Sequence, residues 1–499
     1  MNSKIKGIIV GGVFTLCLAV VAIVLGVTGN FEKGNSSDSS NSSNNSSIEE
    51  VQAIPLVNFK SAQVKHVLIE NTYGKINVSQ TKDGEEDWTV DELEGITQIV
   101  SIKSGIATNA STLSAKDLVE ENATDLAKYG LDQPQSKFTT QFSDTNNTTK
   151  VFLIGDESPE MGYYYVTEEG TNKVYTVQGN KLLYFMQKVE YFVNLTILAE
   201  PSSETEWPTI EDLSVERKDW DYAVRFRTEE NQVEGLMSSQ VMYEPIYSSL
   251  NITHSTAVTH GMWGLAAADT EKVFPTDEDF KTYGISEPNA KVTMKTPNIT
   301  YTLYIGNPIY TKDDEGKDTA IVQGYYAYIE GVKGINAIYI IEPDSVPWAT
   351  FEAVDVISSL MTTNPIGTVK SIVVDKSGEK DVFKLIGATE ENTKDLVVTI
   401  NDKINADVDQ FKLFYQELIS CPTNEIYFKE PTGNLYMTVS INLGDSEESD
   451  VIQFYTDTDR RYIIKLNGAP TFRVSSKWVE QFVENIQNLK DGKEVKSYL

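Results

Sequence analysis

The sequence has few of the residues that build metal and nucleophilic sites. Its 499 residues include two cysteines and three histidines. Cys17 lies in an apolar N-terminal run, so only Cys421 remains beyond that run and no intramolecular disulfide can form there. His254 and His260 lie in a Thr-rich segment without the cysteine or carboxylate neighbours of a zinc site. We therefore expect no metal and no cofactor, and we interpret Cys421 as a packing residue at a helix end.

The short motifs of three common enzyme classes are also absent. The sequence contains no Gly-x-x-x-x-Gly-Lys phosphate loop, no Gly-x-Ser-x-Gly elbow and no His-Glu-x-x-His pattern. Ser377 and Lys380 match a bare Ser-x-x-Lys pattern, but the segment reads as a turn between two strands. We assign no catalytic residue and expect no enzyme, although a pair of carboxylates that converges in space stays open.

Positive charge is scarce. Lys plus Arg number 42 against 73 Asp plus Glu, which gives a net charge of −31. Such a balance repels phosphate backbones, and we expect no nucleic-acid partner. The acidic residues are scattered through the chain, as on a solvated surface.

A long uncharged run follows the first residues. Lys4 and Lys6 precede Ile8–Val27, which contains no charged side chain. As a helix this run spans roughly 30 Å, enough to cross the hydrocarbon core of a bilayer. The lysines predict a cytoplasmic N-terminus, with the bulk of the chain on the extracellular face of the cell membrane. A cleaved signal peptide is the competing interpretation, but the run exceeds a usual signal-peptide core, which favours a single-pass anchor.

Composition then divides the chain. Gly34–Ser47 is nearly all Ser and Asn, which predicts a flexible tether of about 20 Å average span. At about 150 residues per domain, the length predicts roughly three domains. The expected segments are a cytoplasmic N-terminus (1–7), a transmembrane anchor (8–28), a tether (29–59), and three repeat domains (60–200, 207–360 and 366–490).

An internal repeat supports this division. Tyr129-Gly130-Leu131-Asp132-Gln133-Pro134 returns as Tyr283-Gly284-Ile285-Ser286-Glu287-Pro288, displaced by 283 − 129 = 154 residues. The sequence Leu153-Ile154-Gly155 likewise returns as Tyr304-Ile305-Gly306. In a third, degenerate copy, only Glu430-Pro431 survives from the first motif.

The order of elements within each copy predicts the fold class. Strands with turn residues between them are followed by a helical region, a β-meander and a closing helix. This indicates an α+β chain: an N-terminal transmembrane helix, then tandem repeats of a mostly antiparallel β-meander domain with packed helices. The expected helices cover 96–104, 114–129, 180–192, 242–250, 346–360, 408–419 and 477–489.

Two groups of repeated residues are candidate site residues. Tyr129, Gly130, Leu131 and Pro134, with Tyr283, Gly284, Ile285 and Pro288, have the composition of a helix stop that launches a strand, and we interpret them as a structural motif. Strand alternation predicts exposed aromatic rings in the two tyrosine clusters. The candidates are Tyr163, Tyr165, Tyr325 and Tyr328, for which sugar stacking competes with ordinary strand packing.

An acidic segment raises one further alternative. Tyr310–Ala320 carries four carboxylates, which suggests a calcium loop. Their spacing does not fit the calcium-loop pattern, and we predict an acidic hairpin tip instead.

Taken together, Trp88-Thr89-Val90, Lys128-Tyr129-Gly130-Leu131 with Pro134, Leu153-Ile154-Gly155 and Val174-Tyr175-Thr176-Val177 resemble a known family. It comprises bacterial membrane-anchored proteins, typical of Gram-positive species, that are built from a repeated domain of unknown function (domain of unknown function 4340). The resemblance covers roughly residues 60 to 490, with a good second copy and a weak third. It implies association with gliding-type ABC transporter operons, and hence a permease and an auxiliary membrane protein as partners.

These observations lead to two functional hypotheses. The first is a non-catalytic, membrane-anchored extracytoplasmic accessory subunit of an ABC transporter or envelope complex. The alternative is a cell-envelope glycan-binding module or a carboxylate-dependent envelope hydrolase.

Overall fold

A computed structural model describes residues 53–203, 207–229, 238–260, 262–358, 360–389, 392–422, 425–444 and 449–498. The predicted anchor Ile8–Val27 and the tether lie outside these residues. Within the described ranges, no helix is long and apolar enough to cross a membrane.

The first large sheet has eight strands in the order β4-β3-β2-β7-β8-β9-β10-β6. All of its pairings are antiparallel. The strands are β2 (Val64–Asn71), β3 (Gly74–Gln80), β4 (Trp88–Val90), β6 (Asp117–Glu120), β7 (Ser136–Phe142), β8 (Thr149–Glu157), β9 (Tyr163–Glu168) and β10 (Val174–Gln178). A separate pair joins β1 (Ile54–Pro55) to β5 (Ser114–Ala115).

The second sheet has nine strands in the order β14-β13-β12-β11-β16-β17-β18-β19-β15, again antiparallel. Two of its strands, β17 and β18, have 13 residues each. The strands are β11 (Asp212–Arg217), β12 (Ala223–Thr228), β13 (Gln240–Glu244), β14 (Ser248–Ser249), β15 (Asp269–Val273), β16 (Ala290–Lys295), β17 (Thr300–Lys312), β18 (Asp318–Glu330) and β19 (Ala337–Ile341).

The third sheet also has nine antiparallel strands, in the order β23-β22-β21-β20-β25-β26-β27-β28-β24. The strands are β20 (Val369–Lys376), β21 (Glu379–Ile386), β22 (Val397–Ile400), β23 (Ile404–Asn405), β24 (Glu425–Ile426), β25 (Leu435–Leu443), β26 (Ser449–Thr458), β27 (Arg461–Leu466) and β28 (Ala469–Ser475).

The three sheets repeat one strand order. In each, the strand at the far edge (β6, β15 or β24) comes earlier in the chain than the meander whose last strand it pairs with. The agreement extends to single positions in the first and third sheets. There β2 and β20 bury their first, fourth and sixth residues, and the register shifts after the first residue in both. The degenerate third copy therefore keeps the full topology although it lost the Tyr-Gly sequence.

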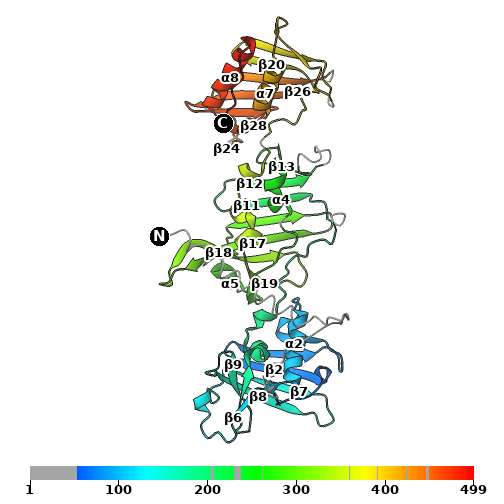
Figure 1. Ribbon diagram of the computed structural model, residues 1–499, viewed down its shortest axis with the longest axis vertical. Coiled ribbons are helices and arrows are strands. Elements are labelled where there is room, and N and C mark those ends of the chain that lie inside the picture. The colour runs from blue at the N-terminus through cyan, green and yellow to red at the C-terminus, as the bar shows by residue number, and fades with distance from the viewer. Residues whose placement is uncertain are drawn as a thin grey trace, which may run out of the picture. The chain divides into compact units, whose positions relative to one another are not determined.

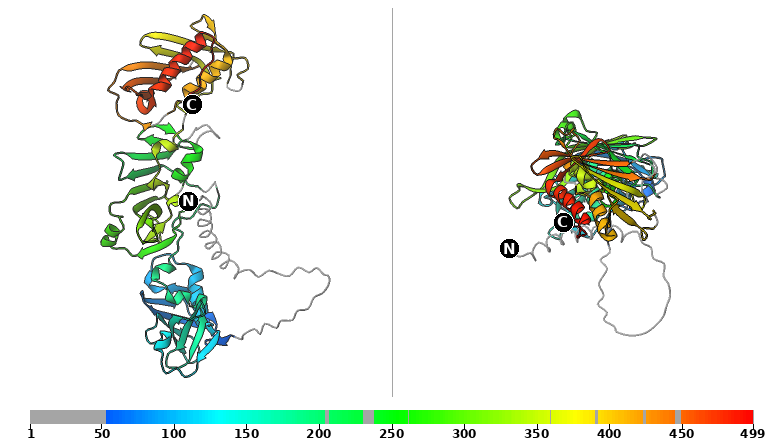
Figure 2. Two further views of the ribbon diagram at one scale, coloured as in Figure 1. Left: turned by 60° about the vertical axis from the view of Figure 1, so that its left-hand side comes forward. Right: turned by 90° about the horizontal axis from the view of Figure 1, so that it is seen from above.

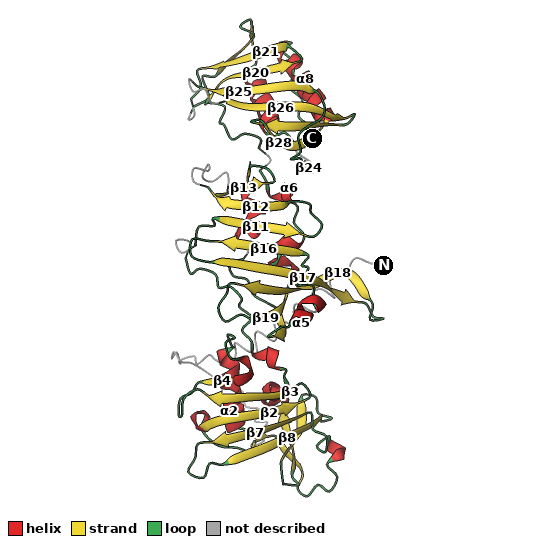
Figure 3. Ribbon diagram, turned by 180° about the vertical axis from the view of Figure 1, so that it is seen from behind, coloured by secondary structure: helices red, strands yellow, loops and turns green. Residues whose placement is uncertain are grey.

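Helices pack on one face of each sheet (Figure 3). The longest are α2 (Val100–Ser111), α4 (Ile252–His260), α7 (Val408–Ile419) and α8 (Ser476–Lys490). Figure 2 shows α8, in red, running beside α7 across the third sheet. Phe414 of α7 stacks on Phe482 of α8 with ring centroids 4.9 Å apart.

The shorter helical elements complete the chain. They are α3 (Gly179–Leu182), α5 (Asp277–Thr282), α6 (Ala353–Val356), and the 3-10 turns η1 (Ser61–Gln63), η2 (Asp91–Leu93), η3 (Ala127–Tyr129), η4 (Leu183–Met186), η5 (Val189–Phe192), η7 (Pro343–Ser345) and η8 (Pro347–Ala349). Figure 1 gives the position of the labelled elements along the chain.

The structure confirms the mostly antiparallel β-sheets with packed helices and two of the expected helices, 408–419 and 477–489. The expected domain boundaries remain predictions. The helix expected over 96–104 begins later, at Val100.

The prediction of a helix over 114–129 was wrong. This stretch forms β5, β6 and η3, because β6 pairs with β10 along the edge of the sheet. Leu118 and Val119 are both exposed on this edge strand. Tertiary strand pairing thus prevails over a weak local helical preference.

The helix expected over 242–250 was also wrong, because these residues form the β13 and β14 hairpin and Pro245 lies between the two strands. A proline inside a helix removes a hydrogen bond and clashes with the preceding turn. The closing helices expected over 180–192 and 346–360 are each broken into short helical pieces.

Candidate functional site

The repeated Tyr-Gly stretch forms the same tight turn in the first two copies. Gly130 has φ 66° and Gly284 has φ 74°, a left-handed conformation that glycine adopts without cost. The tyrosine before each glycine is hydrogen-bonded through its hydroxyl group to a glutamate of an edge strand. The Tyr129 hydroxyl donates to Glu120 Oε2 at 2.6 Å, and the Tyr283 hydroxyl donates to Glu271 Oε1 at 2.9 Å.

The second repeated sequence packs against the first. A Cβ atom added to Gly155 would lie 2.2 Å from the carbonyl oxygen of Tyr129, and one added to Gly306 would lie 2.3 Å from that of Tyr283. No side chain fits at either glycine. The two motifs of each copy, separated by some 25 residues, are therefore the two sides of one backbone contact.

The rest of the motif supports this contact. Leu131 and Ile285 are buried beside it. The strands β7 and β16 begin two residues after Pro134 and Pro288, as expected of a residue that cannot continue a helix. The motif residues thus support the backbone contact, and the two tyrosine hydroxyl groups are hydrogen-bonded to glutamates.

The third sheet makes a close contact between a loop and a strand at a similar place. Here the glycine lies in the loop, and the carbonyl oxygen that it faces belongs to the strand. A Cβ on Gly433, which follows Pro431, would lie 1.7 Å from the carbonyl oxygen of Thr456 in β26. Here the loop rather than the strand provides the glycine. This exchange explains how the third copy lost the Tyr-Gly sequence without losing the fold.

The candidate exposed aromatics do not form an open stacking surface. Tyr163, Tyr165 and Tyr328 are half-buried. The Tyr165 ring contacts Tyr129 edge-on at 4.8 Å, and the Tyr328 ring contacts Phe280 at 4.9 Å. The Lys116 ammonium lies 4.7 Å from the centre of the Tyr163 ring.

The expectation for Tyr325 was wrong, because its side chain is only 7% exposed. Alternation along β18 turns Tyr325, Ala327 and Ile329 toward the core and leaves Tyr326 and Tyr328 on the opposite face. No local pattern in this cluster shows which of two adjacent tyrosines faces the core, because that depends on how the strand is seated in the sheet. Burial raises the pKa of Tyr325, so its hydroxyl stays protonated at neutral pH.

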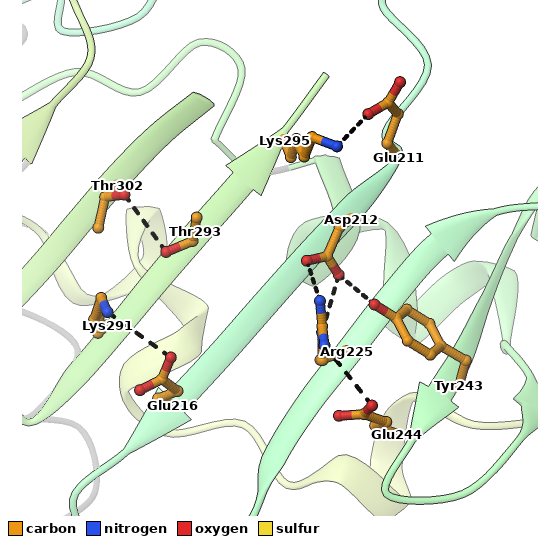
Figure 4. A network of polar contacts seen from close by, with 10 residues as sticks. All are labelled: Glu211, Asp212, Glu216, Arg225, Tyr243, Glu244, Lys291, Thr293, Lys295 and Thr302. Atoms are coloured by element: carbon orange, nitrogen blue, oxygen red, sulfur yellow. Dashed lines mark hydrogen bonds and ion pairs between the residues drawn. The ribbon is translucent and has the colours of Figure 1, made fainter. Parts of the chain in front are cut away.

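A polar network covers part of the open face of the second sheet (Figure 4). Arg225 of β12 lies at its centre and pairs with Asp212 of β11, with Nη2 and Oδ2 2.6 Å apart. The Tyr243 hydroxyl donates to Asp212 Oδ1 at 2.6 Å. Arg225 also approaches Glu244 at 3.7 Å, and its guanidinium lies 5.3 Å from the centre of the Tyr243 ring.

The ionisable side chains of this network are hydrogen-bonded to one another. Burial and the Asp212 carboxylate raise the pKa of Tyr243 to about 12, so it is no phenolate at neutral pH. Asp212 accepts hydrogen bonds from both Arg225 and Tyr243, which occupy its two carboxylate oxygens. The neighbouring pairs Lys291–Glu216 and Lys295–Glu211 continue the same pattern. This face has the character of a solvated sheet surface with cross-strand ion pairs.

Sequence reasoning did not find this network. Its central residues lie 13 and 31 positions apart and become neighbours only through the register of β11, β12 and β13. Glu120 lies within the stretch predicted as a helix, so the sequence did not indicate its hydrogen bond to Tyr129.

Aromatic rings and carboxylates together line a cavity of about 550 Å³. Tyr222 stacks on Trp220 with ring centroids 5.2 Å apart and meets Phe428 edge-on at 5.1 Å. The cavity is lined by Asp221, Tyr222, Glu352, Ala353, Val354, Glu425, Ile426, Tyr427, Phe428, Lys429 and Arg473.

Arginines neutralise the glutamates of this cavity. Glu425 accepts from Arg473 at 2.7 Å and also pairs with Arg461. Glu352 lies 3.9 Å from Arg217. Arg473 is held further by Asp457 at 3.0 Å and stacks over Tyr427 at 4.5 Å. An acid and base couple needs one carboxylate in an apolar setting, whereas each of these two glutamates lies beside a guanidinium group.

The cysteine and histidines that sequence analysis singled out have ordinary surroundings. Cys421 is buried just beyond α7, where desolvation raises the pKa of its thiol. His260 shares hydrogen bonds with Gln240 and Thr259, and burial lowers its pKa. In the described part of the chain, no three His, Cys, Asp or Glu side chains gather as a metal site would require.

Part of the chain matches a known family. Residues 88–251 match the family described as Domain of unknown function (DUF4340). No curated protein and no solved structure matches the chain. The DUF4340 match covers 251 − 88 + 1 = 164 of the 499 residues. It begins at Trp88, the first residue of β4, and ends just after β14, so it includes the Tyr129 turn but stops before the Tyr283 turn.

Proposed function

We propose that this protein is a non-catalytic, extracytoplasmic accessory subunit of an ABC transporter or envelope complex, anchored in the cell membrane by Ile8–Val27. The observation that carries the proposal is the use of the repeated Tyr-Gly and Ile-Gly motifs. They are the most distinctive feature of the sequence, and they serve backbone packing rather than chemistry. A chain that repeats a sheet architecture in this way is suited to presenting surfaces to partners.

The identity of the partners rests on the family resemblance. Companions of gliding-type ABC transporters work beside a permease and an auxiliary membrane protein, and the DUF4340 match over residues 88–251 agrees with that resemblance. The net charge of −31 favours partners with basic surfaces over nucleic acid.

Affinity purification tests this proposal. The full chain, tagged at its C-terminus, is crosslinked in cells of the native host and purified from gently solubilised membranes. We expect the permease and ATPase of an ABC transporter to be enriched. The control replaces Ile8–Val27 by an unrelated apolar span, so that enrichment shared by membrane proteins in general is subtracted. Absence of ABC components from repeated preparations would refute the proposal.

The cavity beside Tyr222 and Phe428 favours a second candidate, a glycan-binding module. Aromatic rings and polar groups in one cavity are typical of sugar sites. Sedimentation with purified cell-wall glycan tests it directly. Binding that Tyr222→Ala abolishes, and that Tyr73→Ala at an exposed tyrosine outside the cavity leaves unchanged, would favour the glycan-binding function.

A further inference from the structure

The hairpin formed by β17 and β18 extends beyond the second sheet, and we call residues 308–324 the arm. We propose that the arm is a docking element for a partner protein that presents a basic patch beside an apolar recess. The inference rests on the proposed function only in taking the partner to belong to the envelope complex.

The arm continues where its neighbouring strands stop. β16 pairs with Thr300–Ile305 of β17, and β19 pairs with Tyr325–Ala327 of β18. Between these limits, the described pairings of the arm join β17 to β18 alone. Figures 1 and 3 show this two-stranded ribbon reaching out from the edge of the sheet.

The corresponding hairpins of the other two sheets are shorter. β8 and β9 have nine and six residues, and β26 and β27 have ten and six, against 13 in both β17 and β18. A two-stranded ribbon by itself is marginally stable in water. The first and third sheets keep the repeated fold without such an extension. A contact with another molecule would account for the arm in the second sheet.

The arm is ordered before it meets a partner. At its tip, Asp313 Oδ1 accepts from the backbone N–H groups of Glu315 and Lys317, both at 2.9 Å. Behind the tip, the hydroxyls of Thr311 and Thr319 are hydrogen-bonded across the two strands. A preformed ribbon loses little conformational entropy on binding, which favours its use as a docking element.

The surface of the arm defines the chemistry of its partner. Ile321 is 66% exposed and Tyr310 is 37% exposed, so each strand of the arm carries an exposed apolar side chain. The tip adds a surplus of negative charge, with four carboxylates against two ammonium groups: Asp313, Asp314, Glu315 and Asp318 against Lys312 and Lys317. A complementary surface therefore combines lysine or arginine with an apolar recess.

A second copy of the chain fits this surface poorly. A symmetric contact between two arms would bring identical acidic tips together, and their repulsion opposes association. The bulges at Pro308 and Tyr310 likewise disturb the regular edge that open-ended strand pairing requires.

Site-specific photocrosslinking in the native host tests the arm. The full chain carries a photoreactive residue at position 321 or, as a matched control, at Ile386, which is 62% exposed at the end of β21. We expect crosslinking at 321 to exceed that at 386 and to map to a Lys- or Arg-rich partner segment with apolar residues. Equal yields at both positions, or a product that is lipid, a second copy or an acidic protein segment, would overturn the inference.

A substitution in the arm measures how much one of its side chains contributes to the contact. With the photoreactive residue at Tyr310, Ile321→Asp should lower the crosslinking yield about tenfold, as for loss of one well-packed contact. Ile386→Asp should leave the yield unchanged, and unchanged circular dichroism of both variants shows that they fold. An unchanged yield in the Ile321→Asp chain would contradict the inference.

The outcomes separate this inference from the proposed function. If ABC components copurify but Ile321→Asp has no effect, the arm inference fails and the accessory role stands. If the arm crosslinks to a basic segment of another envelope protein and no ABC component is recovered, the transporter assignment fails and the arm inference stands.

Discussion

At the residue scale, the contact between the Tyr129 carbonyl and Gly155 explains why two short sequences recur together. The turn brings a backbone oxygen so close to the strand that a single added carbon would collide with it. The same arrangement joins Tyr283 to Gly306. The repeated motif, which we interpret from sequence as structural, meets a steric requirement of this contact.

Substitution of the strand glycine tests this explanation. Gly155→Ala should destabilise the first sheet by about 1–3 kcal/mol, because the new Cβ forces the backbone apart. Hydrogen exchange of the β7 and β8 amides measures the loss locally. Thr149→Ala, at an exposed position of the same strand, should stay within about 0.5 kcal/mol. Equal effects of the two substitutions would show that the contact is unimportant.

The Tyr283 hydroxyl gives a prediction that depends on pH. Burial and the bond to Glu271 raise its pKa to about 12, above the value near 10 of an unfolded tyrosine. The folded state therefore favours the protonated phenol, and this stabilisation is complete below pH 10 and lost as the pH rises toward 12. The stability advantage of the native protein over Tyr283→Phe should shrink across that window in denaturant unfolding. A difference that stays constant from pH 9 to 12 would contradict the assignment.

At the element scale, the helices show what local sequence can and cannot predict. The predictions for α7 and α8 were correct because their apolar residues recur at helical spacing and bury one face. The conformation of β6 depends on β10, which lies more than 50 residues later in the chain. No local pattern contains that information.

The same reasoning applies to the candidate site residues. The Tyr-Gly turn was predictable because glycine permits a left-handed turn and proline cannot continue a helix, and both effects are local. Its partners Glu120 and Gly155, and the Asp212, Arg225 and Tyr243 network, follow from strand register and could not be read from spacing. Tyr325 shows the same limit of sequence-based prediction within one strand. A shift of one residue in the alternation exchanges the buried and the exposed side chains.

The packing of α7 on α8 gives a prediction at this scale. Phe414→Ala removes a fully buried ring that stacks on Phe482, and should cost about 3–5 kcal/mol. Leu413→Ala removes a neighbouring side chain that is 46% exposed, and should have little effect. Hydrogen exchange of the α8 amides measures both. Protection that is equally retained in the two variants would contradict the packing described.

At the scale of the whole molecule, one strand order occurs three times with different surfaces. The first sheet contains the larger part of the DUF4340 match, the second adds the arm, and the third keeps the topology with an altered turn. Repetition of a scaffold with divergence at its surface is what a subunit needs when it must contact several partners, and it agrees with the accessory role we propose.

The predicted anchor gives a prediction about location. The full chain should remain in the membrane pellet after alkaline extraction, because Ile8–Val27 is long enough to span the bilayer. Deletion of residues 8–27 should prevent export and membrane attachment. Recovery of a soluble exported chain that begins near residue 30, identified by mass spectrometry of its N-terminal peptide, would show instead that the segment is a cleaved signal peptide.

The most direct test of the accessory role is quantitative copurification of the intact, crosslinked chain from native membranes. The account predicts that the permease and ATPase of one ABC transporter are enriched together, at a constant ratio to the chain, and above the control with the exchanged membrane span. Repeated preparations that contain the chain but no enriched transporter component would contradict it.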